Sequence, residues 1–298
     1  MYVKMFGLMA LLCLVGLAGD SAPRPEKKGL KVFISADIEG VAGVVNSAQT
    51  SSAGEEYQKV REWMTDEVLA AIEGARAAGA TEFIVADSHG SMLNLIPDKF
   101  GTDTKLIRGW ARPLGMMQGI DSTFDAVFFI GYHAQAGTEN AIIAHTITGG
   151  IYNLKINGVT VPEAGLNALI AGHFGVPVAL ISGDKAAAEQ ATNLIGGIET
   201  AVVKEGISEA VLTLPPPSAC LLIRGKAEKA LQRLGECRPF KMPPPYRFEI
   251  ELVHESTAEI ASWIPGIKRE TPRSISYTDS DLLKIIPLLR IITRFISL

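Results

Sequence analysis

Cysteine is scarce in this sequence of 298 residues, which contains three. None of the three lies in a spacing such as C-x-x-C, so a structural zinc site built from thiolates is excluded. Cys13 falls in an N-terminal apolar stretch, and the large Leu12 before it argues against lipoprotein processing. Cys220 and Cys237 could pair in an oxidising compartment, and the sequence leaves that bridge open.

The sequence also has little net charge and no basic stripe. It carries 28 Lys and Arg residues against 32 Asp and Glu, a net charge of −4 that argues against nucleic acid as a partner. Its 47% of hydrophobic and 20% of charged residues are typical of a globular protein rather than a disordered one. A chain of this length can bury a sizeable core in one large domain or two modest ones.

A long apolar run is missing too, and this decides how the N-terminus is interpreted. Residues 5–18 are apolar, follow the positive Lys4 and contain the small Gly16 and Ala18 near their end, as a secretory signal peptide does. The run is shorter than the roughly 20 apolar residues that span a membrane, so an uncleaved anchor is the lesser alternative. We predict a signal peptide over residues 1–18, a flexible leader over residues 19–29, and a periplasmic or extracellular protein with no stable membrane span after cleavage.

Three apolar segments are each followed by side chains that can bind a metal. Residues 31–36 precede Asp37 and Glu39, residues 83–86 precede Asp87 and His89, and residues 126–130 precede His133. Asp37 and Glu39 are two residues apart and therefore point to the same side of an extended chain. In an open α/β sheet, ligands bind at the carboxyl ends of the strands. We therefore expect these side chains to meet at one edge of a sheet.

Helix and strand patterns alternate between these segments. Residues 55–78 have helical periodicity and lead directly into the strand at residues 83–86, which predicts a βαβ unit with parallel strands. Asn157-Gly158 separates two alternating segments and predicts a hairpin. Residues 142–146 also have a strand-like pattern. Proline-rich segments mark a change in composition after about residue 210, and an amphipathic helix that docks on the body is predicted at the C-terminus.

The candidate ligands form a mixed set of oxygen and nitrogen donors: Asp37, Glu39, His89, His133 and Glu163, the last at the start of a predicted helix. Imidazole and carboxylate together suit zinc, and also manganese or cobalt. Five side chains exceed the roughly three that one catalytic zinc uses, and a carboxylate joining two ions about 3.5–4 Å apart would account for the surplus. Such a pair generates hydroxide near neutral pH, so the residues predict a hydrolase and leave open which bond it cleaves.

Five short motifs in succession carry a family resemblance: SADIEG at residues 35–40, DSH at 87–89, GYHA at 131–134, AHT at 144–146 and EAGLNA at 163–168. In order and approximate spacing they resemble the DppA-type zinc D-aminopeptidases, from residue 31 to the carboxyl terminus. The resemblance implies two zinc ions per subunit, release of N-terminal D-amino acids from short peptides such as D-Ala-D-Ala, and a large ring-type homo-oligomer. For the fold it implies a three-layer α/β domain with a largely parallel sheet, over residues 30–210, and a smaller α+β domain over residues 211–298.

The resemblance also implies a role for each site residue. Asp37 matches the carboxylate that bridges the metals, the other ligands match Glu39, His89, His133 and Glu163, and His145 matches the catalytic histidine. Peptide cleavage requires a proton for the leaving amine, and histidine, with an ordinary pKa of about 6.5, can deliver it. Next to two cations, His145 could serve as general acid, as nucleophile or as a donor to the developing oxyanion. Pro162 stands where the family commonly has glycine, and the export signal is unlike its cytoplasmic members.

Other interpretations of the same residues remain open. Asp87 is expected to orient His89 rather than bind metal, and Asn167 to contact substrate or lie on the surface of its helix. An exported peptide-binding protein without turnover would leave the clustered ligands unexplained. A dinuclear metallophosphoesterase would be expected to have more Asn and His ligands.

Overall fold

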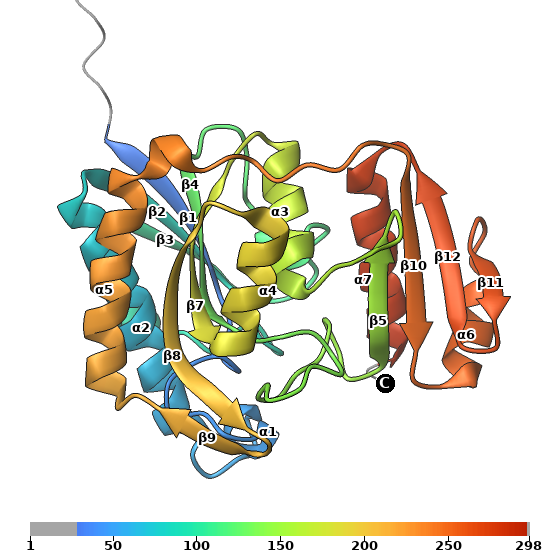
Figure 1. The fold of residues 1–298 in the computed structure, drawn as a ribbon, viewed down its shortest axis with the longest axis horizontal. Coiled ribbons are helices and arrows are strands. Elements are labelled where there is room, and N and C mark those ends of the chain that lie inside the picture. Colours follow the sequence, from blue (N-terminus) through green and yellow to red (C-terminus); the bar gives the residue numbers. More distant parts are fainter. Residues whose placement is uncertain (1–28, 297–298) are drawn as a thin grey trace, which may run out of the picture.

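The computed structural model describes residues 29–296 and is built on two sheets (Figure 1). The first has seven strands in the order β3-β2-β1-β4-β7-β8-β9, and all neighbours are parallel except β8 and β9. Its strands are β1 (Leu30–Ala36), β2 (Ala80–Asp87), β3 (Thr104–Ile107), β4 (Ala126–Tyr132), β7 (Val178–Asp184), β8 (Glu199–Ile207) and β9 (Ala210–Thr213).

Helices cover both faces of this sheet. α2 (Tyr57–Ala77) and α5 (Pro216–Gln232) pack against each other on one face, whereas α3 (Glu163–His173) and α4 (Lys185–Ile195) lie on the other (Figure 1). Successive side chains of a strand point to opposite faces, so Ile34 joins the core under α2 and α5 while Phe33 joins the core under α3. The central strands β1, β4 and β7 are buried on both faces, as the apolar segments in the sequence predict.

The second sheet is antiparallel and has five strands in the order β11-β12-β10-β5-β6. Its strands are β5 (Ile151–Ile156), β6 (Val159–Thr160), β10 (Tyr246–Leu252), β11 (Lys268–Thr271) and β12 (Ser274–Asp279). The Asn157-Gly158 hairpin joins β5 to β6 as predicted, with both residues at positive φ. The remaining elements are α1 (Ser47–Thr50), α6 (Glu255–Ser262), α7 (Leu282–Ile296) and the 3₁₀ turns η1 (Pro97–Lys99), η2 (Gly115–Met117) and η3 (Leu234–Glu236).

Helix α7 joins the two halves of the molecule. It lies between α3 and the second sheet in Figure 1 and contacts α3, β12 and α6. Its buried face, including Ile285, Leu289 and Ile292, belongs to one core cluster with Phe248 of β10. The C-terminal segment thus docks on the body, as its amphipathic pattern predicts.

The predicted fold class is confirmed, and one predicted strand is wrong. Residues 142–146 form a loop because Ile143 adopts a positive φ of 53° and Thr146 makes only an isolated bridge to Thr148. The sheets also do not divide at residue 211. β5 and β6 come from before it but pair in the second sheet, whereas α5 comes after it and packs on the first.

Two further expectations concern the termini and the cysteines. The predicted signal peptide and nearly all of the leader fall in residues 1–28, outside the described part of the chain. No helix over residues 29–296 combines the length and the apolar character that crossing a membrane requires. Cys220 and Cys237 are free thiols in the structure, so it contains no bridge between them.

Candidate metal centre

The structure brings all six predicted site residues together at the carboxyl edge of the first sheet. Three adjacent strands supply four of them, because β2, β1 and β4 are neighbours and parallel. Asp37 and Glu39 follow β1, His89 follows β2, His133 follows β4, Glu163 begins α3, and His145 lies in the loop between β4 and β5. The three carboxylates are almost fully buried, each with 3–4% of its surface exposed.

Two glycines let the segments that follow β1 and β4 approach each other closely. A Cβ on Gly40 would lie 2.0 Å from the carbonyl oxygen of Tyr132, and one on Gly131 would lie 2.2 Å from that of Asp37. The Gly40 N–H donates to the Gly131 carbonyl over 2.8 Å. The ligand motif SADIEG therefore requires glycine at its end for a steric reason.

Lys204 of β8 anchors the backbone of the segment that follows β1. Its ammonium group is buried and donates to the backbone carbonyls of Glu39, Val41 and Val44. A buried charge needs such partners. Lys204 thus fixes the path of the chain directly after the two carboxylates, and the sequence pattern does not predict this role.

Each of the three histidines uses one ring nitrogen for a backbone carbonyl. The pairs are His89 Nε2 with Thr50 O at 3.2 Å, His133 Nδ1 with Ala134 O at 2.9 Å, and His145 Nδ1 with Ile143 O at 2.9 Å. A carbonyl only accepts, so the facing nitrogen carries the hydrogen and the other nitrogen keeps a free lone pair in the neutral ring. Histidines that bind metals are usually oriented in this way.

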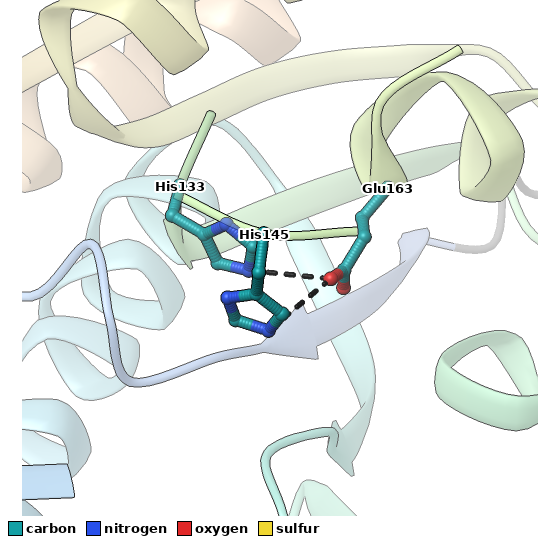
Figure 2. A group of neighbouring side chains, drawn as sticks. All are labelled: His133, His145 and Glu163. Atoms are coloured by element: carbon teal, nitrogen blue, oxygen red, sulfur yellow. Dashed lines mark ion pairs between the residues drawn. The ribbon is translucent and has the colours of Figure 1, made fainter. Parts of the chain in front are cut away.

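The free nitrogens all face carboxylates. His89 Nδ1 lies 3.0 Å from the Glu39 carboxylate and 3.5 Å from Asp37 Oδ1. His133 Nε2 lies 3.6 Å from Asp37 Oδ2 and 3.3 Å from Glu163 Oε1, and His145 Nε2 lies 3.6 Å from the same Glu163 oxygen. Figure 2 shows His133, His145 and Glu163, and the two histidine rings stack with centroids 4.0 Å apart. Asp37 therefore lies between two groups of donors, His89 with Glu39 and His133 with Glu163, and presents a different oxygen to each.

Zinc fits this set of donors. His133 Nε2 is buried and has no hydrogen-bond partner among the described residues. Burial and the neighbouring carboxylate of Glu39 raise the pKa of Asp37 to about 8. Burial lowers the pKa of His133, but Glu163 and the other carboxylates outweigh it and raise that pKa to about 10. Both shifts reflect several carboxylates buried close together, and such a cluster is stabilised by positive charge, which a divalent cation supplies.

Two triples of donors are compact enough to hold an ion. Asp37, Glu39 and His133 form one, and His133, His145 and Glu163 form the other, with the donor atoms of each triple within 4.8 Å of one another. The geometry therefore admits His145 as a ligand as well as a catalytic group. His145 differs from His133 in exposure, since 22% of its side chain is accessible against 1%.

The centre opens into a cavity of 380 Å³, and His145 lies on its wall. The cavity takes lining residues from strand ends, from the loop before β5 and from α7: Asp37, Glu39, His89, Trp110, His145, Glu163 and Arg290 among others. Arg290 and Trp110 were not predicted, and no spacing in the sequence links α7 to the strand ends.

Two residues beside the ligands have other contacts than expected. The Asp87 carboxylate accepts hydrogen bonds from the backbone of Asn94 and Leu95 and from the Asn94 amide, which also donates to the His89 carbonyl. Asp87 thus acts on the His89 backbone through Asn94 and not on the ring. Asn167 is buried and donates to the hydroxyl of Tyr132, so it neither faces solvent nor lines the cavity.

Pro162 does not displace the Glu163 carboxylate from the candidate metal centre. It is the N-cap residue of α3 with an extended backbone, and Glu163 follows as the first helical residue. The Glu163 Oε1 atom accepts from the Ile147 N–H over 2.5 Å. The substitution of proline for glycine at this position is therefore compatible with a carboxylate that faces His133.

Comparisons with known proteins agree with this geometry. A family model described as D-aminopeptidase, peptidase M55, matches residues 30–291. A D-aminopeptidase of Bacillus subtilis (strain 168) is 35% identical over 267 residues, which cover 89% of this chain and 97% of the relative. A solved structure described as the Zn-dependent D-aminopeptidase DppA from Bacillus subtilis, a self-compartmentalizing protease, is similar with a TM-score of 0.86 and 34% identity, again over 89% and 97% of the two chains.

Proposed function

Because this chain belongs to the D-aminopeptidase family of peptidase M55, we propose that it is a dinuclear zinc aminopeptidase. Its substrates are short peptides such as D-Ala-D-Ala, from which it releases the N-terminal D-amino acid. It works as a large homo-oligomer outside the cytoplasm.

The position of Asp37 is the observation that supports two metal ions. Its two oxygens face different histidines, His89 on one side and His133 on the other. One carboxylate can therefore serve both groups of donors, with Glu39 beside His89 and Glu163 beside His133. Bound here, zinc would polarise the scissile carbonyl and lower the pKa of a water molecule.

The protein's own residues hold these groups in one arrangement before substrate arrives. The carbonyls of Thr50 and Ala134 fix the orientation of His89 and His133. The N-terminus of α1 contributes to this, because the Asn46 side chain caps α1 and its end presents the Thr50 carbonyl. Such fixed groups need no rearrangement during the reaction.

His145 is the residue proposed to move the proton. It lines the cavity, and its Nδ1–H donates to the Ile143 carbonyl, so Nε2 is the atom that takes up and releases a proton. From the cavity wall, Nε2 can deliver that proton to the leaving amine of a peptide bound in the cavity. General acid–base catalysis of this kind contributes about 10²–10⁴ to the rate.

The oligomer and the location are parts of the same proposal. The similar structure is described as a self-compartmentalizing protease, which supports a homo-oligomer for this chain. The apolar stretch at residues 5–18 supports export. A mature protein from the native host that begins near Gly19 by intact mass would agree, whereas full-length protein in the cytoplasm would contradict export.

Three substrates separate this function from its alternatives. We expect the purified protein to hydrolyse D-Ala-D-Ala faster than L-Ala-L-Ala, to lose activity with a chelator and to recover it with zinc. Hydrolysis of p-nitrophenyl phosphate in place of the peptides would indicate a phosphoesterase. Tight peptide binding without any turnover in the zinc-loaded protein would indicate a binding protein.

A further inference from the structure

The cavity at the metal centre is lined by charges of both signs. Its carboxylates come from strand ends and from α3, whereas its guanidinium groups come from α7, which carries Arg290 and Arg294. The carboxylates converge on the histidines and on the metal ions that these residues would hold. Nothing in the metal centre requires the arginines, so their presence in the same cavity needs a separate explanation.

Arg290 is the more buried of the two arginines, and the described residues do not supply hydrogen-bond acceptors for all of its N–H groups. Its Nε atom is buried and has no hydrogen-bond acceptor among residues 29–296. The Arg290 side chain forms no ion pair with any residue in this range. Its guanidinium group packs on the face of Trp110, with the central carbon 4.7 Å from the ring centroid. Burial lowers the pKa of Arg290, and Glu163 acts in the opposite direction. An unpaired buried N–H is costly, and a guanidinium at the cavity wall that lacks protein acceptors can pair with an acceptor on a ligand.

Two buried cations among the described residues, Arg112 and Lys204, provide the comparison. Arg112 donates from Nε and both terminal nitrogens to the carbonyls of Gly109, Asp87 and Ile107, all at 2.8 Å. Lys204 likewise has three carbonyl acceptors. Each of these cations is saturated by backbone and holds a loop in place. Arg290 has no such acceptors, and it differs from both in lining the cavity.

The side chain of Arg290 is nevertheless held in position. Trp110, which packs against its guanidinium, is fixed by a hydrogen bond from Nε1 to the Gly90 carbonyl over 2.9 Å. A Cβ on Gly115 would lie 3.4 Å from Arg290 Cδ, so the stem of the arginine also runs against the η2 turn. An arginine stacked on an aromatic ring keeps its planar N–H groups free for a carboxylate or phosphate.

We propose that Arg290 binds the C-terminal carboxylate of the peptide whose scissile bond lies at the metal centre. This inference rests on the proposed function and specifies its substrate class: zwitterionic di- and tripeptides with a free carboxylate. Arginine pairs with carboxylates through two parallel hydrogen bonds. The cavity of 380 Å³ is at the small end of the range for small-molecule sites, which agrees with a short peptide.

The test compares two substrates that differ only at the C-terminus, D-Ala-D-Ala and D-Ala-D-alaninamide. The zinc-loaded oligomer should prefer the free acid. The variant Arg290→Met keeps an apolar stem against Trp110 and removes the charge. It should reduce kcat/KM for the acid about 10- to 100-fold, mainly through KM, while the amide changes little. The affinity for a non-hydrolysable analogue, in which CH₂–NH replaces the peptide bond, should be lower in Arg290→Met than in the wild type by a similar factor, as measured by calorimetry.

Two variants of the same helix serve as controls. Lys284→Gln removes a positive charge from an exposed position on α7 outside the cavity and should leave the preference intact. Arg294→Gln removes the exposed arginine at the cavity and should weaken the preference much less than Arg290→Met. Zinc content and melting temperature verify that each variant is folded.

The experiment distinguishes a wrong assignment of Arg290 from a failure of the proposed function. If the wild type hydrolyses neither substrate, the aminopeptidase function fails. If it hydrolyses both equally well, or if Arg290→Met weakens both equally in a folded, zinc-loaded protein, the assignment of Arg290 is wrong. If Arg294→Gln alone abolishes the preference, the carboxylate site belongs to that residue and the assignment to Arg290 is again wrong.

Discussion

The edge of the first sheet and helix α7 line the same cavity, but they carry different chemical groups and are held in place by different interactions. The sheet edge presents carboxylates and imidazoles that follow parallel strands, and these groups face one another within 3.0–3.6 Å. Helix α7 presents guanidinium groups and is held mainly by apolar packing against α3 and the second sheet. Under the proposed function, the sheet edge performs the chemistry and α7 selects the substrate. Changes at the edge should therefore act on metal content and kcat, and changes near α7 on KM.

The largest effect is expected from Asp37→Ala. This change removes the carboxylate that faces both His89 and His133, and neither ion should be held in its place. Since bound metal contributes several kcal/mol to catalysis, kcat/KM should fall roughly a thousandfold or more. Metal analysis alongside the assay checks this, and a variant that keeps the full zinc content of the wild type would refute the ligand assignment.

The next effect is expected from His145→Ala. If His145 moves a proton, kcat should fall about 10²–10⁴-fold while zinc content and KM stay close to those of the wild type. Loss of zinc would make His145 a ligand of the triple it forms with His133 and Glu163. Near-normal turnover with zinc retained would reduce it to a packing residue and end the proposed mechanism.

Lys204→Met tests the support beneath the sheet edge. The change leaves the carbonyls of Glu39, Val41 and Val44 without their donor, which should lower the free energy of unfolding by about 1–3 kcal/mol. Because the segment carrying Glu39 loses its anchor, zinc affinity should fall about 10- to 100-fold. Chemical denaturation and a competition titration with a chelator measure the two effects. Lys185→Met is a fitting control, since that lysine is on the surface and pairs with Glu205, and its loss should leave zinc affinity unchanged.

The smallest effect is expected from Trp110→Leu. The ring supports the Arg290 guanidinium, and a cation–π contact of this kind is worth about 0.5–1 kcal/mol at a partly exposed site. KM for D-Ala-D-Ala should therefore rise roughly two- to fivefold, with kcat and zinc content unchanged. A fall in kcat with unchanged KM would contradict the division between the sheet edge and α7.

The sheet edge could be predicted from the sequence because its signals are local. Asp37, Glu39, His89 and His133 directly follow apolar segments, and parallel strands place their carboxyl ends at one edge. Glu163 is a candidate because it precedes a predicted helix, and the family motifs supply the role of His145. The loop at residues 142–146 was wrongly predicted as a strand, since periodicity alone does not reveal the positive φ of Ile143.

The α7 side could not be predicted in this way. Arg290 follows the amphipathic pattern of a surface arginine, and its burial arises only where α7 packs beside Trp110, a residue 180 positions earlier in the chain. Lys204 offered a weak signal, because it is a charged residue within the apolar strand segment that begins at Thr200. Exposed strands with polar residues, such as β11, were missed for a related reason: they lack an apolar face to reveal them.

The most direct test of the central claim is anomalous diffraction from crystals of the zinc-loaded protein at the zinc absorption edge. We expect two peaks per chain, about 3.5–4 Å apart, with the Asp37 carboxylate between them and His89 and His133 on different ions. A single peak, or two peaks with Asp37 bound to only one of them, would contradict the dinuclear site proposed for this chain.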